Sequence, residues 1–181
     1  EDVFVSYPRG IDWGTPYPQG LNGKKVVPLS LRNNGSEMLL YIEGNSADET
    51  GLYISEYKSS QWRAPHLVSK DLNSRKQEFK GACFAENGRA IYYSSNKDGG
   101  YGGFDLYLIR EEGKDWSEPQ NLGSTINTKF DEVTPFMHSD EQTLFFSSDG
   151  HNSMGGFDVF ETATRYAMEW KQTKNLGYPV N

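Results

Sequence analysis

Cysteine and long apolar segments are both scarce in this sequence. Its 181 residues include a single cysteine, Cys83, which excludes an internal disulfide framework and any zinc site built from several cysteines. No apolar run approaches the roughly 20 residues that a membrane-spanning helix needs. No basic segment followed by an apolar one opens the chain, so we expect that any signal peptide has been removed or lies outside this sequence.

Basic charge and helical periodicity are also lacking. Lys and Arg together number 18 against 25 Asp and Glu, which gives a formal net charge of −7. This balance argues against a general nucleic-acid binder, because neutralising phosphates requires a surplus of basic residues. No long window repeats apolar residues at positions i, i+3 and i+4, which is the pattern of an amphipathic helix.

Aromatic and turn-forming residues are plentiful instead. The chain is only 35% hydrophobic, yet it is 14% aromatic and contains 19 Gly and 8 Pro. Short runs of aromatic and β-branched residues between turns rich in Gly and Asn favour β-strands. The composition therefore predicts an all-β protein.

Four tryptophans mark an internal repeat. Trp62, Trp116 and Trp170 are spaced 54 residues apart, and Trp13 lies 49 residues before Trp62. Other features recur in the same frame: a proline after each of the first three tryptophans, an Asn-Leu-Gly segment at 121–123 and 175–177, and an aliphatic–Asn pair at 21–22, 72–73, 126–127 and 180–181. One period holds four short runs, for example 134–138, 143–148, 157–162 and 169–172.

A period of this length with four strands predicts a β-propeller of four-stranded antiparallel blades. The register predicts a partial blade over 1–22 and full blades over 23–73, 74–127 and 128–181, all within a single domain, 1–181. This amounts to about three and a half blades, whereas propellers close with roughly four to eight. We expect other segments, or a second copy of the chain, to complete the ring.

Two glycine-rich segments raise the question of a binding site. Residues 94–107 read SSNKDGGYGGFDLY and residues 147–160 read SSDGHNSMGGFDVF. Neither matches a dinucleotide or P-loop fingerprint, and neither has the acidic ladder of an EF-hand calcium loop. We interpret both as connections between the second and third strands of a blade, in which Asp105 and Asp158 accept hydrogen bonds from nearby backbone N–H groups. An ion site and a partner contact stay open as alternatives.

The tips of these loops are the predicted contact points for a protein partner, because recognition concentrates on loops carried by a rigid scaffold. The residues proposed for this role are Lys97, Asp98, Tyr101, His151, Asn152 and Met154.

Two carboxylates precede first strands at positions 54 residues apart, Glu78 and Glu132. Paired carboxylates around a channel would suit a glycosidase. Recurrence in successive blades favours a structural role instead, as acceptors for backbone N–H groups where a blade begins. The turn at 139–143, SDEQT, faintly resembles the Asp-box turns of sialidase propellers but lacks their Gly and Trp.

The remaining reactive residue types form no constellation. His66, His138 and His151 lie on different repeat elements without a metal-ligand spacing. No G-x-S-x-G nucleophile motif is present. Cys83 stands 54 residues before Met137, so we interpret it as a small core residue. We predict no catalytic residue, no metal and no cofactor.

The blade pattern resembles the WD40-like β-propeller repeat, which is related to the TolB propeller. The resemblance rests on SDEQTLFFSSDGH followed by GGFDVF, together with the Trp, Pro, Asn-Leu-Gly and Ile-Asn positions. More narrowly, the chain is similar to Bacteroidetes proteins that join such repeats to tetratricopeptide units and a C-terminal OmpA-like peptidoglycan-binding domain. The PorE/SprE-type component of the type IX secretion system belongs to this OmpA-family group. Repeats two and three match well, whereas residues 43–51 lack the Gly-Gly-Phe-Asp motif.

The resemblance implies a periplasmic binding scaffold associated with the outer membrane. We therefore expect a non-catalytic protein–protein interaction module that binds other envelope proteins, as part of a secretion or outer-membrane–peptidoglycan complex. Two other functions stay open. One is a carbohydrate-active enzyme that uses Glu78 and Glu132, and the other is a propeller that binds a small ligand or an ion.

Overall fold

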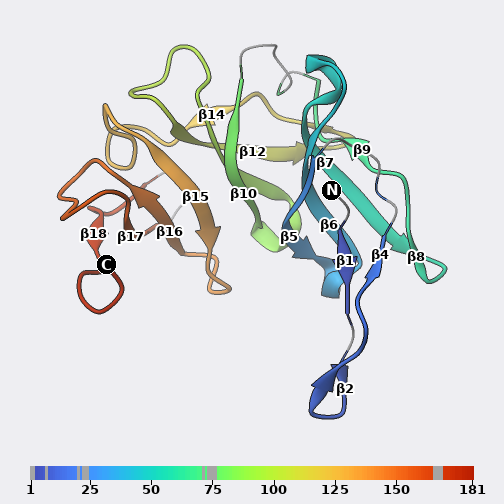
Figure 1. The fold of residues 1–181 in the computed structure, drawn as a ribbon. Coiled ribbons are helices and arrows are strands. Elements are labelled where there is room, and N and C mark those ends of the chain that lie inside the picture. Colours follow the sequence, from blue (N-terminus) through green and yellow to red (C-terminus); the bar gives the residue numbers. More distant parts are fainter. Residues whose placement is uncertain are drawn as a thin grey trace. The chain divides into compact units, whose positions relative to one another are not determined.

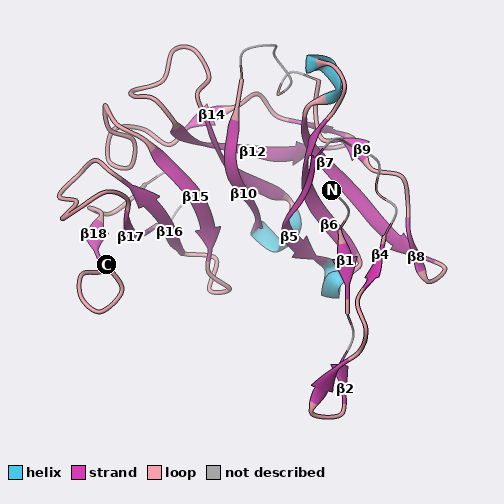
Figure 2. Ribbon diagram, in the orientation of Figure 1, coloured by secondary structure: helices cyan, strands magenta, loops and turns pink. Residues whose placement is uncertain are grey.

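The computed structural model describes residues 3–6, 8–19, 21, 25–70, 72, 77–164 and 169–181. These residues form β-strands joined by turns, with only three short 3-10 turns (Figure 2), so the all-β prediction is confirmed. The chain divides into two compact units, Glu1–Arg75 and Lys76–Asn181, which are described separately.

Unit 1 contains one complete sheet and two strand pairs (Figure 1). The sheet, blade 1, has the order β5-β6-β7-β8, with β9 pairing β7 beyond β8. Its strands are β5 (Lys25–Arg32), β6 (Glu37–Glu43), β7 (Gly51–Lys58), β8 (Gln61–Trp62) and β9 (His66–Leu67). The strand pairs, together called the half-blade, join β1 (Phe4–Val5) to β4 (Tyr17–Pro18) and β2 (Pro8–Arg9) to β3 (Asp12–Trp13).

Unit 2 contains two complete antiparallel sheets. Blade 2 comprises β10 (Phe79–Ala85), β11 (Ala90–Ser95), β12 (Asp105–Glu112), β13 (Asp115–Trp116) and β14 (Gln120–Asn121). Blade 3 comprises β15 (Glu132–Met137), β16 (Thr143–Ser148), β17 (Asp158–Ala163) and β18 (Lys174–Asn175). In both sheets the first four strands each pair with the next one along the chain, which is the meander of a propeller blade, and in blade 2 β14 also pairs with β12.

The fourth strand of a blade is interrupted, which the sequence analysis did not anticipate. In blades 1 and 2 the third strand pairs first with a two-residue strand that carries the tryptophan, and then with a second short strand a few residues later. Pro65 and Pro119 lie between these two segments. Proline has no N–H to donate to the ladder, so the pairing breaks there.

The tryptophans occupy equivalent places, as a true repeat requires. Each one pairs in an antiparallel sense with a residue five or six positions before it in the chain. The pairs are Pro8 with Trp13, Tyr57 with Trp62, Glu111 with Trp116, and Thr164 with Trp170. The spacing in the sequence therefore measures a structural period.

The turn between the first and second strands repeats as well. In blade 1 it is a 3-10 turn over Asn33–Gly35, and in blade 2 it spans Glu86–Gly88. Asn34 and Asn87 hold positive φ values of 54° and 53°. Asn tolerates this left-handed conformation because its short polar side chain can bond the local backbone.

The core of unit 2 lies between its two sheets, which pack face to face. Residues of a strand alternate between the two faces, so each sheet offers one set of side chains to this core. Blade 2 contributes Cys83, Ala85, Ala90, Tyr92, Leu106 and Leu108, and blade 3 contributes Met137, Leu144, Phe146 and Phe160, with Trp170 packed against them. We call the face that blade 2 presents to this core its back face, and the face that blade 3 presents to it a front face. The same names are used for the corresponding faces of every blade.

Hydrogen bonds join the same two sheets around the core. The Glu141 carboxylate accepts the N–H groups of Glu86 (2.6 Å) and Asn87 (3.3 Å), so a turn of blade 3 caps a turn of blade 2. At the other end, Ser94 Oγ donates to the Glu132 carbonyl oxygen (2.7 Å). In between, the Met137 N–H donates to Cys83 Sγ (3.2 Å).

A glycine permits the closest approach of the two sheets. Gly81 lies at a bulge of β10 with a φ of 109°. A Cβ atom at Gly81 would lie 2.9 Å from the Cα of Thr134 in β15, closer than such atoms pack. β10 and β15 consequently lie side by side (Figure 1).

Unit 1 repeats this packing on a smaller scale. Its core joins Val3 and Leu21 of the half-blade to Val26, Met38, Leu40 and Ile42 of blade 1, with Tyr53 and Trp62 packed against them. The half-blade thus covers the front face of blade 1.

Removing a ring from the core of unit 2 should be costly. Phe160 is fully buried, and Phe160→Ala leaves a cavity between the two sheets, so the free energy of unfolding should fall by about 3–5 kcal/mol. Phe157, in the same segment, is 50% exposed, and Phe157→Ala should cost less than about 1 kcal/mol. Urea unfolding of both variants is the measurement; equal losses would contradict the packing described.

Candidate functional site

The glycine-rich loop of blade 2 folds onto the carboxylate of Asp105, which is 1% exposed. Asp105 accepts the N–H groups of Tyr101 (2.5 Å, to Oδ2) and Gly102 (3.1 Å, to Oδ1). The side chain of Asn121 also donates to Asp105 Oδ2 (2.8 Å). Both carboxylate oxygens are therefore engaged by the protein itself.

Asn127 continues this network into the sheet. Its Oδ1 accepts the N–H of Leu106 (2.8 Å), and its Nδ2 donates to the Leu106 carbonyl (3.0 Å) and to Asn121 Oδ1 (2.8 Å). The amide pairs with both backbone groups of Leu106, as a neighbouring strand would. We call Asp105, Asn121 and Asn127 the Asp–Asn–Asn relay of blade 2.

Blade 3 contains the same relay. Asp158 accepts the N–H of Met154 (2.7 Å) and the side chain of Asn175 (2.8 Å), and Asn181 bonds both backbone groups of Val159 and the Asn175 side chain. The hydrogen bond from Met154, followed by that from Asn175, holds the pKa of Asp158 below its usual range. The repeated Asn positions were visible in the sequence, but their shared network was not. The earlier aliphatic–Asn pairs include Asn22 and Asn73, which lie outside the described residues.

Blade 1 departs from this pattern. Gly51 begins β7 where Asp105 begins β12, and Leu67 stands where Asn121 does. Its loop is held by local bonds instead: Thr50 Oγ1 donates to the Ser46 carbonyl (2.9 Å) and accepts the Gly44 N–H (3.1 Å). The loop that lacks the Gly-Gly-Phe-Asp motif in the sequence therefore also differs in structure from the loops of blades 2 and 3.

The six residues proposed for partner contact are not equally available. Tyr101 is 53% exposed and Met154 is 66% exposed, each on its own loop. Asp98 and Asn152 are exposed as well, whereas Lys97 is half-buried.

His151 is anchored within blade 3. Its Nε2 lies 2.7 Å from the Ile126 carbonyl oxygen, and its ring packs against Phe160 (centroids 5.2 Å apart) and Phe146 (6.0 Å). This histidine stabilises the loop base and is nevertheless exposed, as Asn152 and Met154 are.

Glu132 is fully buried at the start of β15. Its Oε2 accepts the Thr128 N–H (2.8 Å), and its Oε1 accepts the hydroxyl groups of Thr128 (2.8 Å) and Ser148 (2.8 Å). Burial raises the pKa of Glu132 above its usual range, against the lowering effect of these hydrogen bonds. The carboxylate joins the loop, the first strand and the second strand of one blade.

Glu78 is not the counterpart of Glu132, which corrects the equivalence inferred from the sequence. Glu132 pairs with Ser148 of the next strand, whereas Phe79 pairs with the matching Ser95. Glu78 is exposed and donates its N–H to Asn96 Oδ1 (2.7 Å). The two carboxylates therefore do not recur at one position.

One extra residue explains the shift. Trp170 pairs with a residue six positions before it in the chain, whereas Trp116 pairs with a residue five positions before it. Counting from the tryptophans is therefore off by one for the first three strands, and Cys83 aligns with Phe136 rather than with Met137. Cys83 is nevertheless buried, as expected of a small core residue, and burial raises the pKa of its thiol to about 12.

The turn at 139–143 uses its aspartate as an Asp-box turn does. Asp140 accepts the N–H groups of Gln142 (2.9 Å) and Thr143 (2.8 Å) and the Thr143 hydroxyl (2.8 Å). These bonds, the Gln142 N–H foremost, lower the pKa of Asp140 far below its usual range. Asp140 orders the turn from which Glu141 reaches blade 2.

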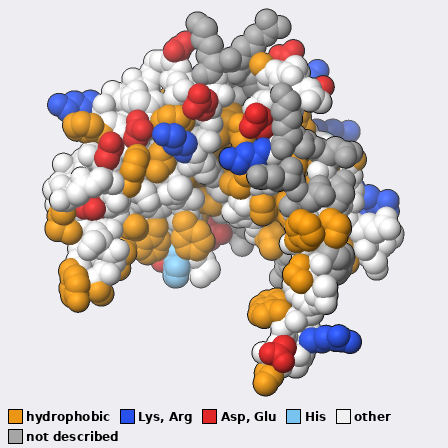
Figure 3. Space-filling view, in the orientation of Figure 1, with side chains coloured by type: hydrophobic (Ala, Val, Ile, Leu, Met, Phe, Trp, Pro, Cys, Tyr) orange, Lys and Arg blue, Asp and Glu red, His pale blue; other side chains and the backbone are white. Residues whose placement is uncertain are grey.

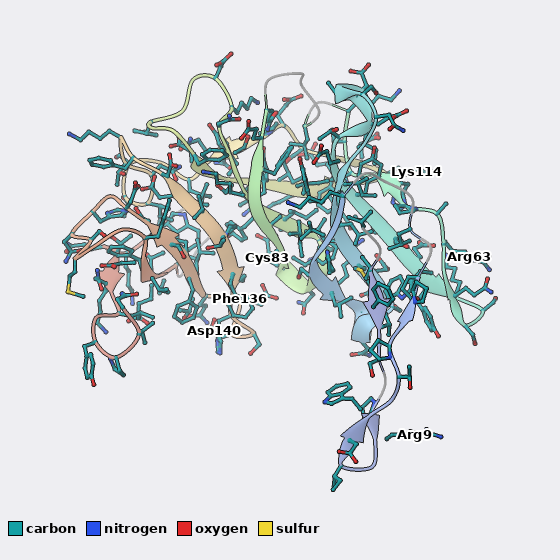
Figure 4. All side chains as sticks on the ribbon, in the orientation of Figure 1. Arg9, Arg63, Cys83, Lys114, Phe136 and Asp140 are labelled. Carbon is teal, nitrogen blue, oxygen red and sulfur yellow. The ribbon has the colours of Figure 1, made fainter. Side chains whose placement is uncertain are left out.

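The back face of blade 3 is exposed. Phe136, on β15, is 56% exposed and lies at a tilt beside Phe145, whose ring also meets His138 edge to face. Figure 4 shows Phe136 and Asp140 near the same end of blade 3, and Figure 3 shows hydrophobic side chains gathered beside a histidine in that region. The residues at the matching positions of blade 2, Cys83, Tyr92 and Ala85, are almost completely buried.

The part of the chain that the structure describes contains neither a cluster of metal-binding side chains nor a membrane-spanning helix. No group of three or more His, Cys, Asp or Glu side chains lies close enough to hold a metal ion. Within the same described ranges, no helix has the length and apolar character needed to span a membrane.

The relay should be a measurable source of stability. Asn127→Ala removes the acceptor of the buried Leu106 N–H, while the Leu106 carbonyl keeps the N–H of Leu122, so the free energy of unfolding should fall by roughly 1–3 kcal/mol. The matched control is Asn152→Ala, on an exposed loop, for which we expect a change within about 0.5 kcal/mol. Equal stability of the two variants in urea unfolding would rule out the relay as described.

Glu132 should give the stability a defined dependence on pH. Because its pKa is raised in the folded state, its contribution is complete below the unfolded value of about 4.5 and is lost as the pH rises through the folded value. Glu132→Gln keeps the shape and an oxygen that accepts the Ser148 hydroxyl but does not ionise, so its stability relative to the native chain should increase as the pH rises above about 4.5. Urea unfolding over this range is the test, with the exposed Glu78→Gln as control; parallel curves for all three chains would refute it.

The fold of this chain is similar to that of known proteins, although its sequence is not. No protein-family model matches the chain, and no curated protein matches its sequence. Among solved structures, a protein from Agrobacterium tumefaciens described as TolB is similar at 13% identity with a TM-score of 0.59, over 83% of this chain and 50% of that one. A puromycin-hydrolysing peptidase of Mycobacterium tuberculosis is similar at 12% identity with a TM-score of 0.53, over 96% of this chain and 30% of that one.

The chain therefore spans half or less of the length of these two proteins. At such low identity the likeness bears on the fold alone. Together with the repeated four-stranded sheets, it shows that this chain has the fold of a partial β-propeller.

Proposed function

We propose that this chain is a non-catalytic protein-interaction scaffold of the bacterial cell envelope. The observation that carries the proposal is the exposed back face of blade 3. At the matching positions blade 2 is covered by blade 3, so the repeat itself defines what kind of surface fits there. A partner that presents a four-stranded sheet can bury Phe136 and Phe145 as blade 3 buries Cys83 and Tyr92.

The contact within unit 2 indicates what such a partner must supply. It needs apolar side chains at positions like those of Phe146 and Phe160. It also needs a hydrogen-bond acceptor for backbone N–H groups of the turn at 139–143, as the Glu141 carboxylate is for the turn of blade 2. Other segments or a second copy of the chain could provide this sheet and complete the propeller. Tyr101, Asn152 and Met154, at the loop tips, are then free to contact other envelope proteins.

The resemblance to WD40-like repeats supports the location. It favours the periplasm and association with the outer membrane, in a secretion complex of the type IX class or a complex between outer membrane and peptidoglycan. The net charge of −7 fits protein partners better than nucleic acid.

Enzymatic functions receive less support from the geometry. Glycoside hydrolysis requires two carboxylates that flank one substrate bond. The Glu132 side chain has no exposed surface and all its hydrogen bonds are internal, while Glu78 occupies a different position. The sequence also lacks the G-x-S-x-G motif that a serine peptidase of the α/β-hydrolase type would need.

The test is a pull-down from envelope extract with mass spectrometry, comparing three baits: the native chain, Phe136→Asp and Phe157→Asp. Both phenylalanines are about half exposed, but only Phe136 lies on the back face of blade 3. We expect a stoichiometric partner that Phe136→Asp loses, by tenfold or more, and that Phe157→Asp retains.

Capture of the same partner by all three baits would exclude this face as the interaction surface. Turnover of a glycan that is lost on Glu132→Gln would replace the scaffold with the carbohydrate-active alternative.

A further inference from the structure

Unit 1 contains a cavity of about 470 Å3 that lies wholly within that unit. It is bounded by β6 and β7 of blade 1, by the loop over 44–49 and by the segment over 62–65. The side chains that give it its character are Asn45, Glu49, Tyr53, Trp62 and Arg63. Its size falls in the range of small-ligand sites, which are roughly 300–1,000 Å3.

The cavity lies where blade 1 departs from the repeat. In blade 2, the loop before the third strand lies directly on Asp105 and Tyr107: a Cβ on Gly100 would meet the Asp105 carboxylate at 2.4 Å and the Tyr107 hydroxyl at 3.0 Å. Tyr53 is the counterpart of Tyr107, because both pair with the second segment of the fourth strand. In blade 1 the aspartate is replaced by Gly51, and Tyr53 lines an open space instead.

The aromatic walls of the cavity are held in fixed orientations. The Tyr53 hydroxyl donates to the Glu49 carbonyl (2.8 Å), which ties the ring to the loop. The ring of Trp62 packs against Tyr57 with centroids 5.4 Å apart and an interplanar angle of 56°. The rings of Tyr53 and Trp62 also pack against the core of unit 1. A wall that is already ordered loses little entropy when a ligand binds.

Several polar groups at the cavity make no hydrogen bond within the described part of the chain. Glu49 accepts the Asn45 N–H through Oε2 (2.9 Å), which leaves Oε1 without a partner there. Over the same residues, the Asn45 amide and the Trp62 indole N–H have no partner either. Together they offer both donors and acceptors to a ligand.

The balance of charges indicates the class of ligand. The lining has one carboxylate, Glu49, and one guanidinium, Arg63, beside a neutral amide. Neither an anion nor a cation is favoured by such a set. A pyranose ring matches it, because its C–H face can stack on an aromatic ring while its hydroxyl groups both donate and accept hydrogen bonds.

We propose that this cavity binds a neutral saccharide, with one sugar ring stacked on Trp62 and its hydroxyl groups bonded by Glu49 and Asn45. The site is independent of the back face of blade 3, which lies in unit 2, so the two functions can be tested separately.

The experiment is isothermal titration calorimetry of the native chain with cellobiose, maltose and N,N′-diacetylchitobiose at concentrations up to tens of millimolar. We expect saturable binding of at least one of these sugars. Trp62→Ala should weaken that binding at least about tenfold, because the stacking surface is lost. Trp116→Ala removes the equivalent tryptophan of blade 2, which does not line the cavity, and should leave the affinity unchanged.

Two milder variants keep the test decisive if Trp62→Ala does not fold. Glu49→Gln and Asn45→Ala change exposed loop residues, and each should weaken sugar binding several-fold while the thermal melting temperature stays unchanged. Glucosamine and glucuronate, which carry opposite charges, serve as further ligands.

Three outcomes overturn the proposal. The first is no binding of any neutral sugar at the highest concentration. The second is binding of a charged ligand alone. The third is sugar binding that Trp62→Ala, Glu49→Gln and Asn45→Ala all leave intact.

Discussion

Everything in this structure depends on the packing of one four-stranded sheet against the face of the next. A sheet whose strands carry apolar residues on both faces needs two neighbours, and a single such sheet is marginal in water. In unit 2 the contact between blades 2 and 3 satisfies one face of each, through Tyr92 and Leu108 on one side and Phe146 and Phe160 on the other. Among the described residues of unit 2 the back face of blade 3 is left exposed, and its aromatic residues form the surface that we propose for interaction.

The hydrogen-bonded relays act on a second level, because they hold the loops that the sheets carry. In blades 2 and 3 the aspartate and the two asparagines form hydrogen bonds with the backbone. These bonds hold each loop against its own sheet. In blade 1 Gly51 begins the third strand in place of the aspartate, and the space beside Tyr53 opens into a cavity. Repetition thus builds the sheets, and the departure from repetition leaves the cavity for which we propose a saccharide.

Much of the fold could be predicted from the sequence, because the tryptophan period and the hairpin turns are local signals. The second segment of each fourth strand could not, since two-residue strands leave no periodic pattern. Glu78 and Glu132 were paired wrongly because one extra residue before Trp170 shifts the count. His151 gave no sign of packing on Phe160, a contact that arises only when the loop folds back. The cavity in unit 1 was equally invisible, because its walls come from segments that are distant in sequence.

The most direct measurement of the central claim is a double-mutant cycle across the two sheets of unit 2. Tyr92 of blade 2 and Trp170 of blade 3 form an edge-to-face pair with ring centroids 6.0 Å apart. Face-to-face packing predicts that Tyr92→Leu and Trp170→Leu are coupled by about 0.5–1.5 kcal/mol in the free energy of unfolding. Strict additivity of the two substitutions would contradict the account, because it would mean that the two sheets do not bury these rings against each other.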